Sequence, residues 1–356
     1  MQIPMTVQDL RTKIDRLPRA KLAFLPTPLH EVPRFAQALG GPRIYIKRDD
    51  QTGLAFGGNK TRMFDFLLAE VAAEGADTVV GGAAVQSNYC RQLTAACNAL
   101  GLEVHLVLRR VRGKKDNDIQ GNFFLDLIAG AHIHVIDATP EEQKQAVYAL
   151  SDRLRAEGKN AYVVRMANDE DLAPDVIGYI ECFCEIVEQS RAVGIDPTHI
   201  YVSSLDTTRA GLEFGKRALG STIDIVGITP ADWEPDIPRL ITTYLNHASA
   251  RLDLPIAVNP EEVANSNTYV GAGYGRVTAE GVEMIKLMAR TEGIFLDPVY
   301  TSKACAALAD HVRKGRLTSD DTVIFIHTGG TPALFAYRDD LDPAELKSRL
   351  SYDVSF

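Results

Sequence analysis

The chain has 356 residues, of which 46% are hydrophobic and 24% are charged, with 27 Gly and 17 Pro. These proportions are typical of globular proteins and exclude a disordered, collagen-like or coiled-coil chain. The 38 basic and 47 acidic side chains give a net charge of −9, which disfavours binding to nucleic acid or to an anionic membrane. At this length we expect two domains, or one large α/β domain with an inserted lobe.

Cysteine usage and local composition indicate the cellular setting. Five cysteines without a CxxC pair favour a reducing, cytoplasmic environment. No apolar run approaches the ~20 residues of a membrane helix, and the first residues carry no signal-peptide core, so we expect a soluble protein without a membrane partner. The one basic run, residues 109–115, is followed by Asp116 and Asp118, and we interpret it as a solvated loop.

Short β-branched runs alternate with longer amphipathic runs from residue 43 onward. We predict strands at residues 43–47, 78–81, 104–108, 133–136, 162–164, 199–203, 223–228 and 322–326. We predict helices from about 63 to Gly75 and near residues 87–100, 117–129, 140–157, 174–190, 208–219, 277–291 and 301–314. This alternation indicates an α/β fold with parallel-rich sheets flanked by helices, and lobe boundaries near 60 and 165–175.

Two segments follow predicted strands and begin helices, where open α/β sheets bind ligands. In residues 57–60, two glycines allow close approach of a ligand, and Lys60 then starts the helix. This lysine is either solvated or catalytic. In the second segment, Gln86, Ser87 and Asn88 place free N–H groups where a carboxylate or phosphate could bind. Ser and Asn are also ordinary helix caps, so both interpretations stay open.

Two further segments occupy equivalent positions. Residues 203–208 carry hydroxyl groups suited to a phosphate but lack glycine, and residues 327–331 form a turn suited equally to packing or binding. Tyr274 and Tyr300 fit either core aromatics or a site. No metal-ligand spacing, GxSxG elbow, P-loop or GxGxxG occurs, so no metal is expected. The residues alone indicate an α/β enzyme with a lysine-bearing site.

Together these segments resemble the fold-type II pyridoxal-phosphate (PLP) enzymes, a two-lobed, tryptophan synthase β-like fold. The resemblance is to the branch that holds D-cysteine desulfhydrase and 1-aminocyclopropane-1-carboxylate (ACC) deaminase, and it spans nearly the whole chain. The matching pieces, in family order, are Ile46-Lys47-Arg48-Asp49-Asp50, Gly57-Gly58-Asn59-Lys60-Thr61-Arg62, Gln86-Ser87-Asn88, Gly273-Tyr274-Gly275, Asp297-Pro298-Val299-Tyr300-Thr301 and His327-Thr328-Gly329-Gly330.

The resemblance implies a role for each matching residue. Lys60 would hold pyridoxal 5'-phosphate as a Schiff base and then move a proton at the substrate Cα, which requires its deprotonated form. Tyr274 and Tyr300 would flank the substrate, where a phenol can donate to a leaving group. The substrate carboxylate would be bound by Gln86, Ser87 and Asn88. The cofactor would be contacted by Asn59, Asp206, Thr207, Thr208, Arg209, Thr328 and Gly329.

Two positions bear on the reaction. Thr328 would face the pyridine nitrogen, and a hydroxyl there leaves the ring neutral, which suits elimination because the leaving group carries the electrons away. The cyclopropane deaminases usually carry Glu after the tyrosine, whereas the desulfhydrase side carries Thr, as here at Thr301. The resemblance therefore implies α,β-elimination on a small amino acid, giving a 2-oxo acid, ammonia and the released β-substituent.

The chain also departs from the family pattern. The phosphate loop holds Leu205, Asp206 and Thr207 where small residues are usual, and Met63 replaces a common lysine. We expect Arg209 to supply the missing positive charge, with Asp206 turned outward or paired with it. The polar stretch of residues 166–171 replaces a small-residue loop near the substrate, which indicates a specificity shifted away from D-cysteine.

Two alternatives remain: an ACC deaminase, disfavoured by Thr301, and a catalytically inactive PLP-fold binding protein, suggested by the altered phosphate loop. The resemblance further implies a large PLP-binding domain from residues 1–60 and 170–356, and a smaller inserted α/β domain from residues 61–169. It also implies a homodimer that acts on a small amino acid.

Overall fold

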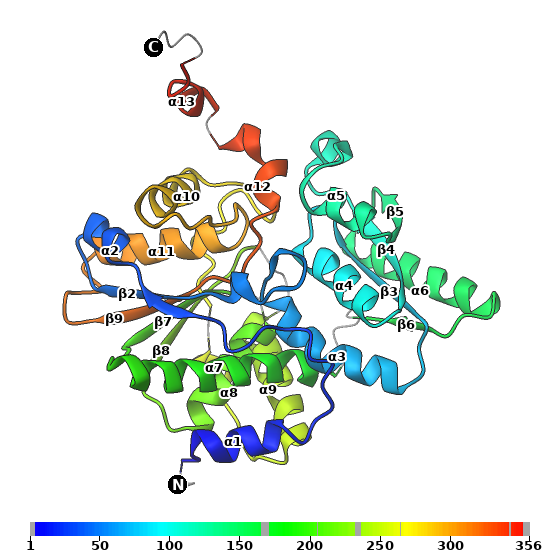
Figure 1. Ribbon diagram of the computed structural model, residues 1–356, viewed down its shortest axis with the longest axis horizontal. Helices are drawn as coiled ribbons and strands as arrows, with labels where there is room; N and C mark the ends of the chain where they lie inside the picture. Colours follow the sequence, from blue (N-terminus) through cyan, green and yellow to red (C-terminus); the bar gives the residue numbers. More distant parts are fainter. Residues whose placement is uncertain are drawn as a thin grey trace.

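The computed structural model describes residues 4–164, 171–204, 206–231, 236–263, 265–341 and 343–351. In these ranges the chain forms two sheets, one of five strands and one of four, each flanked by helices (Figure 1). All strand pairs but one are parallel. The predicted α/β fold with parallel-rich sheets between helices is confirmed.

The larger sheet has the order β1-β2-β9-β7-β8, in which only β1 is antiparallel to its neighbour. Its strands are β1 (Leu29–Glu31), β2 (Arg43–Lys47), β9 (Thr322–Ile326), β7 (His199–Ser203) and β8 (Asp224–Ile228). One face packs against α2 (Pro33–Leu39), α10 (Ala279–Glu292) and α11 (Thr301–Arg313). The other packs against α7 (Ala173–Val193) and α8 (Thr207–Ala218), with α1 (Val7–Ile14) and α9 (Ile237–Leu252) outside them.

The smaller sheet has the order β5-β4-β3-β6 and is parallel throughout. Its strands are β3 (Thr78–Ala84), β4 (Glu103–Arg109), β5 (His132–Ile136) and β6 (Ala161–Val163). One face is covered by α3 (Lys60–Ala73), α4 (Asn88–Ala99) and α5 (Gly121–Ile128), and the other by α6 (Pro140–Ala156). Two short helices, α12 (Ala333–Ala336) and α13 (Pro343–Lys347), follow the last strand.

Local sequence explains where the longer helices begin and end. Thr139 caps α6 through a capping box with Glu142, and Pro140 takes the first helical position, where its missing N–H costs nothing. At the other end of α7, Gly194 adopts φ 71° and closes the helix in the left-handed conformation. These signals are local, so helix positions of this kind follow from the sequence.

All eight predicted strands occur, and the helices that we predicted begin and end close to the expected residues. The helix expected near 117–129 is divided into a 3₁₀ turn at Gly113–Asn117 and α5. Our prediction missed α9, as well as α1 and α2 near the amino terminus. The two sheets agree with the expected two-lobed arrangement. The domain boundaries stay a prediction, and in the boundary expected near 165–175, residues 165–170 lie outside the described residues.

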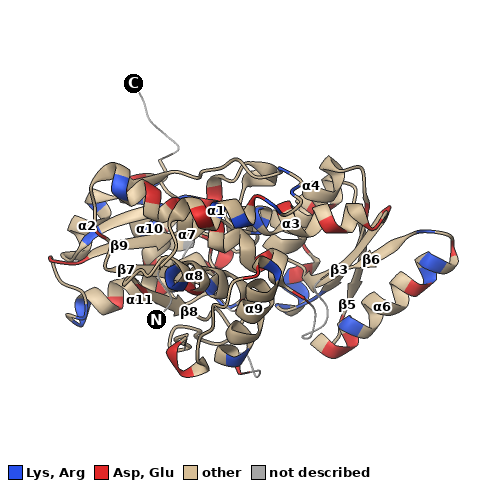
Figure 2. Ribbon diagram, turned by 90° about the horizontal axis from the view of Figure 1, so that it is seen from below, with Lys and Arg blue, Asp and Glu red and all other residues tan. Residues whose placement is uncertain are grey.

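Charges of both signs are interspersed over the helices, as Figure 2 shows for α6. In that view the Lys and Arg side chains form no continuous basic stripe of the kind that binds nucleic acid. The expected lack of a nucleic-acid partner stays a prediction. Among the described residues, every helix is too short or too polar to cross a membrane.

Candidate active site

The loop before α3 has a backbone that only glycine accommodates. Gly57 and Gly58 adopt φ 67° and 135°, and a side chain on Gly57 would overlap the carbonyl oxygen of Asp50. Thr52 holds the loop, since its hydroxyl accepts from the Gly58 N–H at 2.8 Å and donates to the Gly58 carbonyl at 2.9 Å. Helix α3 then begins at Lys60, as predicted.

This loop lies against the segments that follow β7 and β9. The Asn59 N–H donates to the Thr328 carbonyl at 3.0 Å, and the Asn59 amide donates to the Thr208 hydroxyl at 3.4 Å. A Cβ on Gly329 would lie 2.7 Å from the Gly58 Cα, so the two glycine loops touch. The structure therefore brings Asn59, Thr208, Thr328 and Gly329 together beside Lys60, although they come from three distant parts of the sequence.

The segment after β3 serves partly as a helix cap. The Ser87 hydroxyl accepts from the N–H groups of Tyr89 and Cys90, both at 3.2 Å, which is the ordinary N-cap arrangement. Gln86 and Asn88 on either side instead line a cavity. A side chain on Gly330 would clash with Asn88, its Cβ lying 2.7 Å from the Asn88 amide nitrogen, so this segment adjoins the loop after β9.

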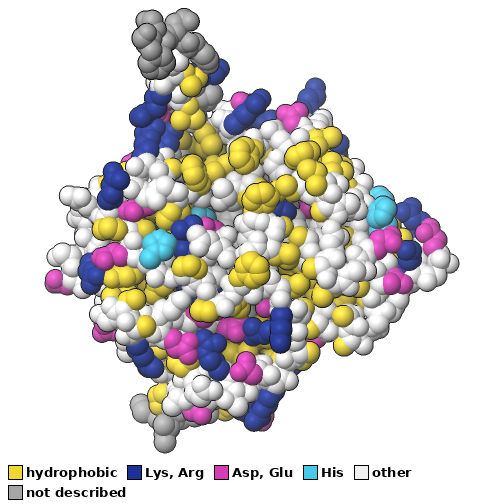
Figure 3. Space-filling model, viewed as in Figure 1, with side chains coloured by type: hydrophobic (Ala, Val, Ile, Leu, Met, Phe, Trp, Pro, Cys, Tyr) yellow, Lys and Arg dark blue, Asp and Glu magenta, His cyan; other side chains and the backbone are white. Residues whose placement is uncertain are grey.

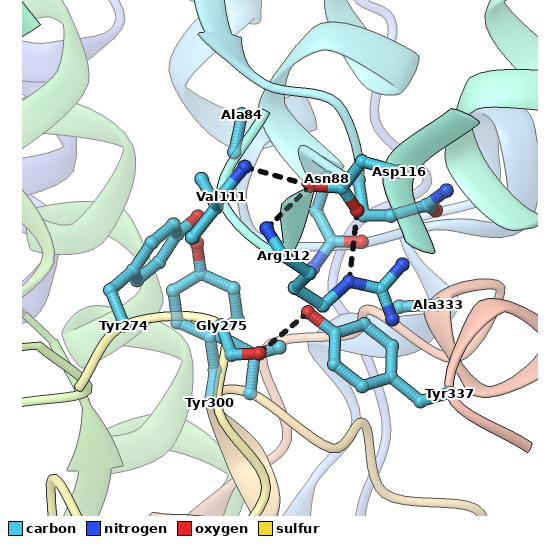
Figure 4. Close-up of a pocket in the computed structure, with 12 residues that line it drawn as sticks. Ala84, Asn88, Val111, Arg112, Asp116, Tyr274, Gly275, Tyr300, Ala333 and Tyr337 are labelled. Atoms are coloured by element: carbon cyan, nitrogen blue, oxygen red, sulfur yellow. Dashed lines mark hydrogen bonds and ion pairs between the residues drawn. The ribbon is translucent and has the colours of Figure 1, made fainter. Parts of the chain in front are cut away.

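The cavity lies beyond the carboxyl ends of β3 and β4 and between the two lobes (Figure 4). Tyr274 and Tyr300 form part of its wall, and their hydroxyl groups are 2.6 Å apart. Burial raises the pKa of both phenols, so both stay protonated at neutral pH. Four of the predicted substrate-site residues, Gln86, Asn88, Tyr274 and Tyr300, thus share one cavity.

Asn122 at the start of α5 supports this wall, and our prediction missed it. Its backbone N–H donates to the Gln86 side chain at 3.0 Å, and its amide donates to the Gln86 carbonyl at 2.9 Å and to the Asn88 side chain at 2.8 Å. The buried Arg91 joins Asn122 to the Gly57 carbonyl at 2.9 and 2.7 Å. This connection fixes the Gln86–Asn88 segment relative to the Lys60 loop.

The start of α8 fits the phosphate of the cofactor. The hydroxyl groups of Ser203 and Thr207 are buried and have no hydrogen-bond partner among the described residues. They accompany Thr208 in the first turn of the helix, and hydroxyl groups at a helix N-terminus suit an anion. In the same turn the N–H groups of Thr207 and Arg209 already donate to the side chains of Asp206 and Ser204. Asp206 caps this helix through the Thr207 N–H at 2.5 Å, and Leu205 lies outside the described residues.

One expectation about this phosphate region needs correction, namely that Arg209 supplies the positive charge for the phosphate. The guanidinium of Arg209 pairs with Glu213 at 2.8 Å and donates to the Ile225 carbonyl, because the i,i+4 spacing places Glu213 one turn further along α8. Its positive charge is therefore already compensated, and only its main chain stays near the predicted site. Met63 is fully buried in the core formed with Tyr45 and Phe183, so that position is used for packing.

The interpretation of residues 109–115 as a solvated loop is wrong for Arg112. This side chain is 7% exposed, its Nε donates to Asp116 at 2.9 Å, and its guanidinium lies 3.9 Å from the centre of the Tyr337 ring. Lys114 and Lys115 are exposed as predicted. A basic run in sequence cannot reveal that Tyr337, far along the chain, covers one of its members.

Thr301 is fully buried and bonded to the loop before it. Its hydroxyl lies 2.7 Å from both a side-chain oxygen and the N–H of Asp297. The side chain of Asp297 also accepts from the N–H groups of Val299 and Tyr300, at 2.9 and 3.0 Å. Thr301 therefore fixes the turn that presents Tyr300 to the cavity.

One group of possible metal ligands occurs in the described part of the chain. Donor atoms of Glu103, His105 and His132 lie within 4.8 Å of one another. However, Glu103 already accepts from Lys159 at 2.5 Å and lies 2.8 Å from the Nε2 of His105, so its carboxylate has partners within the described residues. The group lies at the amino ends of β4 and β5, opposite the cavity, and the expected lack of a metal site stays a prediction.

Comparisons with known proteins agree with this arrangement. Residues 20–329 match the family of pyridoxal-phosphate dependent enzymes, so the chain belongs to that family, and its cofactor is pyridoxal 5'-phosphate. The structure is similar to that of an ACC deaminase homologue, with a TM-score of 0.83 and 33% identity over 93% of this chain and 98% of the other.

More distant structures share the fold. Diaminopropionate ammonia lyase from Escherichia coli gives a TM-score of 0.64 at 15% identity over 98% of this chain and 93% of the other. A threonine deaminase from T.th. gives 0.62 at 18% identity over 92% and 98%. The chain is therefore a fold-type II PLP-dependent enzyme with lyases and deaminases among its structural neighbours.

Proposed function

We propose that this enzyme catalyses α,β-elimination on a small amino acid that carries a β-leaving group, in the manner of D-cysteine desulfhydrase. The observation that carries the proposal is the hydrogen-bonded pair of Tyr274 and Tyr300, 2.6 Å apart in a cavity that Gln86 and Asn88 also line. Pyridoxal 5'-phosphate, when bound, withdraws electrons from the substrate and makes the Cα proton acidic.

Each residue then has a task that its surroundings support. Lys60, at the first position of α3, holds the cofactor and moves the Cα proton. Gln86 and Asn88, held by Asn122, bind the substrate carboxylate. Tyr300, protonated at neutral pH and bonded to Tyr274, donates a proton to the departing β-substituent. The hydroxyl groups of Ser203, Thr207 and Thr208 hold the phosphate, and Thr328 faces the pyridine nitrogen.

ACC deamination is the second candidate, because the ACC deaminase homologue is 33% identical to this chain. Thr301 weighs against it. The hydroxyl of Thr301 donates a hydrogen bond to Asp297. Thr301 therefore supplies no carboxylate to a ring-opening reaction.

A substrate panel distinguishes the candidates. We expect 2-oxo acid and ammonia from β-chloroalanine, cysteine or cysteate in at least one enantiomeric series, and little from the cyclopropane acid. Release of 2-oxobutyrate from the cyclopropane acid alone would establish ACC deamination instead. If the purified protein neither binds the cofactor nor turns over any member of the panel, it is a binding protein that has lost catalysis.

We also propose that two copies associate. Large hydrophobic side chains are exposed on the molecule, and Figure 3 shows such side chains gathered over α5 and α12. On these two helices the exposed hydrophobic side chains are Phe124, Leu127 and Ile128 of α5 and Phe335 of α12, of which Ile128 and Phe335 are 65% and 70% exposed. A patch of this kind marks an association surface, and a second copy is the partner that a PLP enzyme of this branch implies. Light scattering is expected to give twice the 38.9 kDa chain mass, and a monomer would refute the proposal.

The cytoplasm is the compartment that we propose. All five cysteines are buried free thiols, as expected for a protein kept in a reducing environment. Fractionation of the producing cell is expected to place the enzyme in the soluble cytoplasmic fraction, and recovery from an extracellular fraction would contradict this.

A further inference from the structure

The cavity contains a buried cation whose hydrogen-bonding capacity is only partly used. Arg112 lines the cavity and is 7% exposed. Its Nε donates to Asp116 at 2.9 Å and its Nη1 to the Ala336 carbonyl at 2.9 Å, whereas its buried Nη2 has no partner among the described residues. A guanidinium has five N–H donors, and leaving such groups unpaired in a buried place is costly. A ligand that accepts from Nη2 would remove that cost.

Asp116 forms an ion pair with Arg112 but engages its side chain only at Nε, so the N–H groups of Nη2 keep their capacity to donate to a ligand. The oxygens of Asp116 accept from the N–H groups of Val111 and Arg112 at 2.7 and 2.8 Å and from the Arg112 Nε. The carboxylate is therefore occupied by three donors within its own loop. The Tyr337 hydroxyl, in turn, donates to the Gly275 carbonyl at 3.1 Å, so it does not satisfy the guanidinium (Figure 4).

A second arginine adds positive charge to the same region. Arg109 ends β4 and pairs in register with Ala84, which lines the cavity. Its Nε is buried and has no partner in the described part of the chain, and its charge is among those that act on Tyr274. The buried cations of Arg109 and Arg112 are accompanied here by two carboxylates, Asp116 and Asp297, and each carboxylate accepts from N–H groups of its own loop.

We propose that Arg112, supported by Arg109, forms a subsite for an anionic β-substituent of the substrate, an oxyanion such as a sulfonate. Arginine suits an oxyanion because its N–H groups form charge-assisted hydrogen bonds in a fixed plane. Arg112 recognises the group that departs, while Gln86 and Asn88 bind the α-carboxylate. This inference rests on the proposed elimination and specifies its substrate class.

For a sulfonate substrate the reaction balances without a further reactant except water. The Cα–H bond breaks by proton transfer, and the Cβ–S bond breaks with its electron pair leaving on sulfur as sulfite. The resulting 2-aminoacrylate takes up water and gives pyruvate and ammonium. Cysteate and water thus yield pyruvate, ammonium and bisulfite, with one net negative charge on each side.

The test compares two leaving groups in wild type and Arg112→Gln. Cysteate carries an anionic β-substituent and β-chloroalanine a neutral one, and both enantiomers of each are used. We expect Arg112→Gln to lower kcat/KM for cysteate by about 10- to 100-fold, the effect of losing a charge-assisted hydrogen bond. For β-chloroalanine we expect a change below about threefold, since its substituent makes no such bond.

Arg110→Gln is the matched control, because Arg110 lies on the same loop but donates to Asn117 and pairs with Asp137 at 3.2 Å. It should leave both substrates unaffected. Equal losses for both substrates in Arg112→Gln would show that Arg112 only supports the loop, and no loss for cysteate would also overturn the subsite.

Binding of aspartate, a non-eliminated anionic analogue, gives a readout that does not depend on turnover. Calorimetry is expected to show weaker aspartate binding in Arg112→Gln and unchanged alanine binding. If wild type turns over neither cysteate nor β-chloroalanine, the proposed elimination fails, whereas this binding difference still decides the subsite by itself.

Discussion

Replacing Lys60 with alanine is expected to lower the kcat of elimination by at least about 10³-fold, because the variant loses both the amine that holds the cofactor and the base that moves the Cα proton. Steady-state release of 2-oxo acid from the best substrate of the panel measures the effect. The loss should persist at saturating cofactor, since added cofactor cannot restore a missing proton acceptor.

Lys314→Ala is the matched control. Lys314 is an exposed lysine that pairs with Asp310 on α11 at 2.7 Å, and its removal should leave kcat unchanged. Circular dichroism and the melting temperature establish that Lys60→Ala stays folded. A folded Lys60→Ala variant with more than about a tenth of the wild-type kcat would contradict the role that we give to Lys60.

Replacing Glu185 with alanine is expected to cost about 3–5 kcal/mol in the free energy of unfolding, the range found when one partner of a buried ion pair is removed. Glu185 on α7 accepts from Arg62 at 2.8 Å and from Lys47 at 2.6 Å. Arg62 also pairs with Asp49 at 2.8 Å, and all four side chains are at most 2% exposed. The variant would leave two buried cations with one carboxylate.

Urea unfolding of the two variants Glu185→Ala and Glu188→Ala measures this difference. Glu188 lies further along α7 and pairs with Arg11 at 2.6 Å, but its side chain is 45% exposed, so its loss should cost no more than about 1 kcal/mol. Equal destabilisation of the two variants would refute the importance of the buried cluster. The cluster also has a functional consequence, because Arg62 lies in the first turn of α3, close after Lys60.

The fold could be predicted because its determinants are local. Alternation of β-branched and amphipathic runs located the strands, and the glycines before Lys60 located the start of α3. The site residues that were predicted follow strands or begin helices, where parallel topology gathers them at one edge. Helix α9 was missed although Asp236 caps it and Pro238 lies in its first turn.

The parts that could not be predicted depend on long-range contacts. Arg112 is buried by the 333–337 segment, and Asn122 meets Gln86 and Asn88 across 34–36 residues. Arg209 was assigned to the phosphate because of its position, whereas its side chain follows the helix to Glu213. The role of residues 166–171 in specificity stays a prediction, because all of that segment except Asp171 lies outside the described residues.

Chemical trapping of the lysine tests the central claim most directly. The purified protein is treated with borohydride, digested, and its peptides are sequenced by mass spectrometry. We predict a pyridoxyl group fixed to the side chain of Lys60 alone and its disappearance in Lys60→Ala. A pyridoxyl group on another lysine, or an unmodified Lys60 in protein saturated with cofactor, would contradict our account of the site.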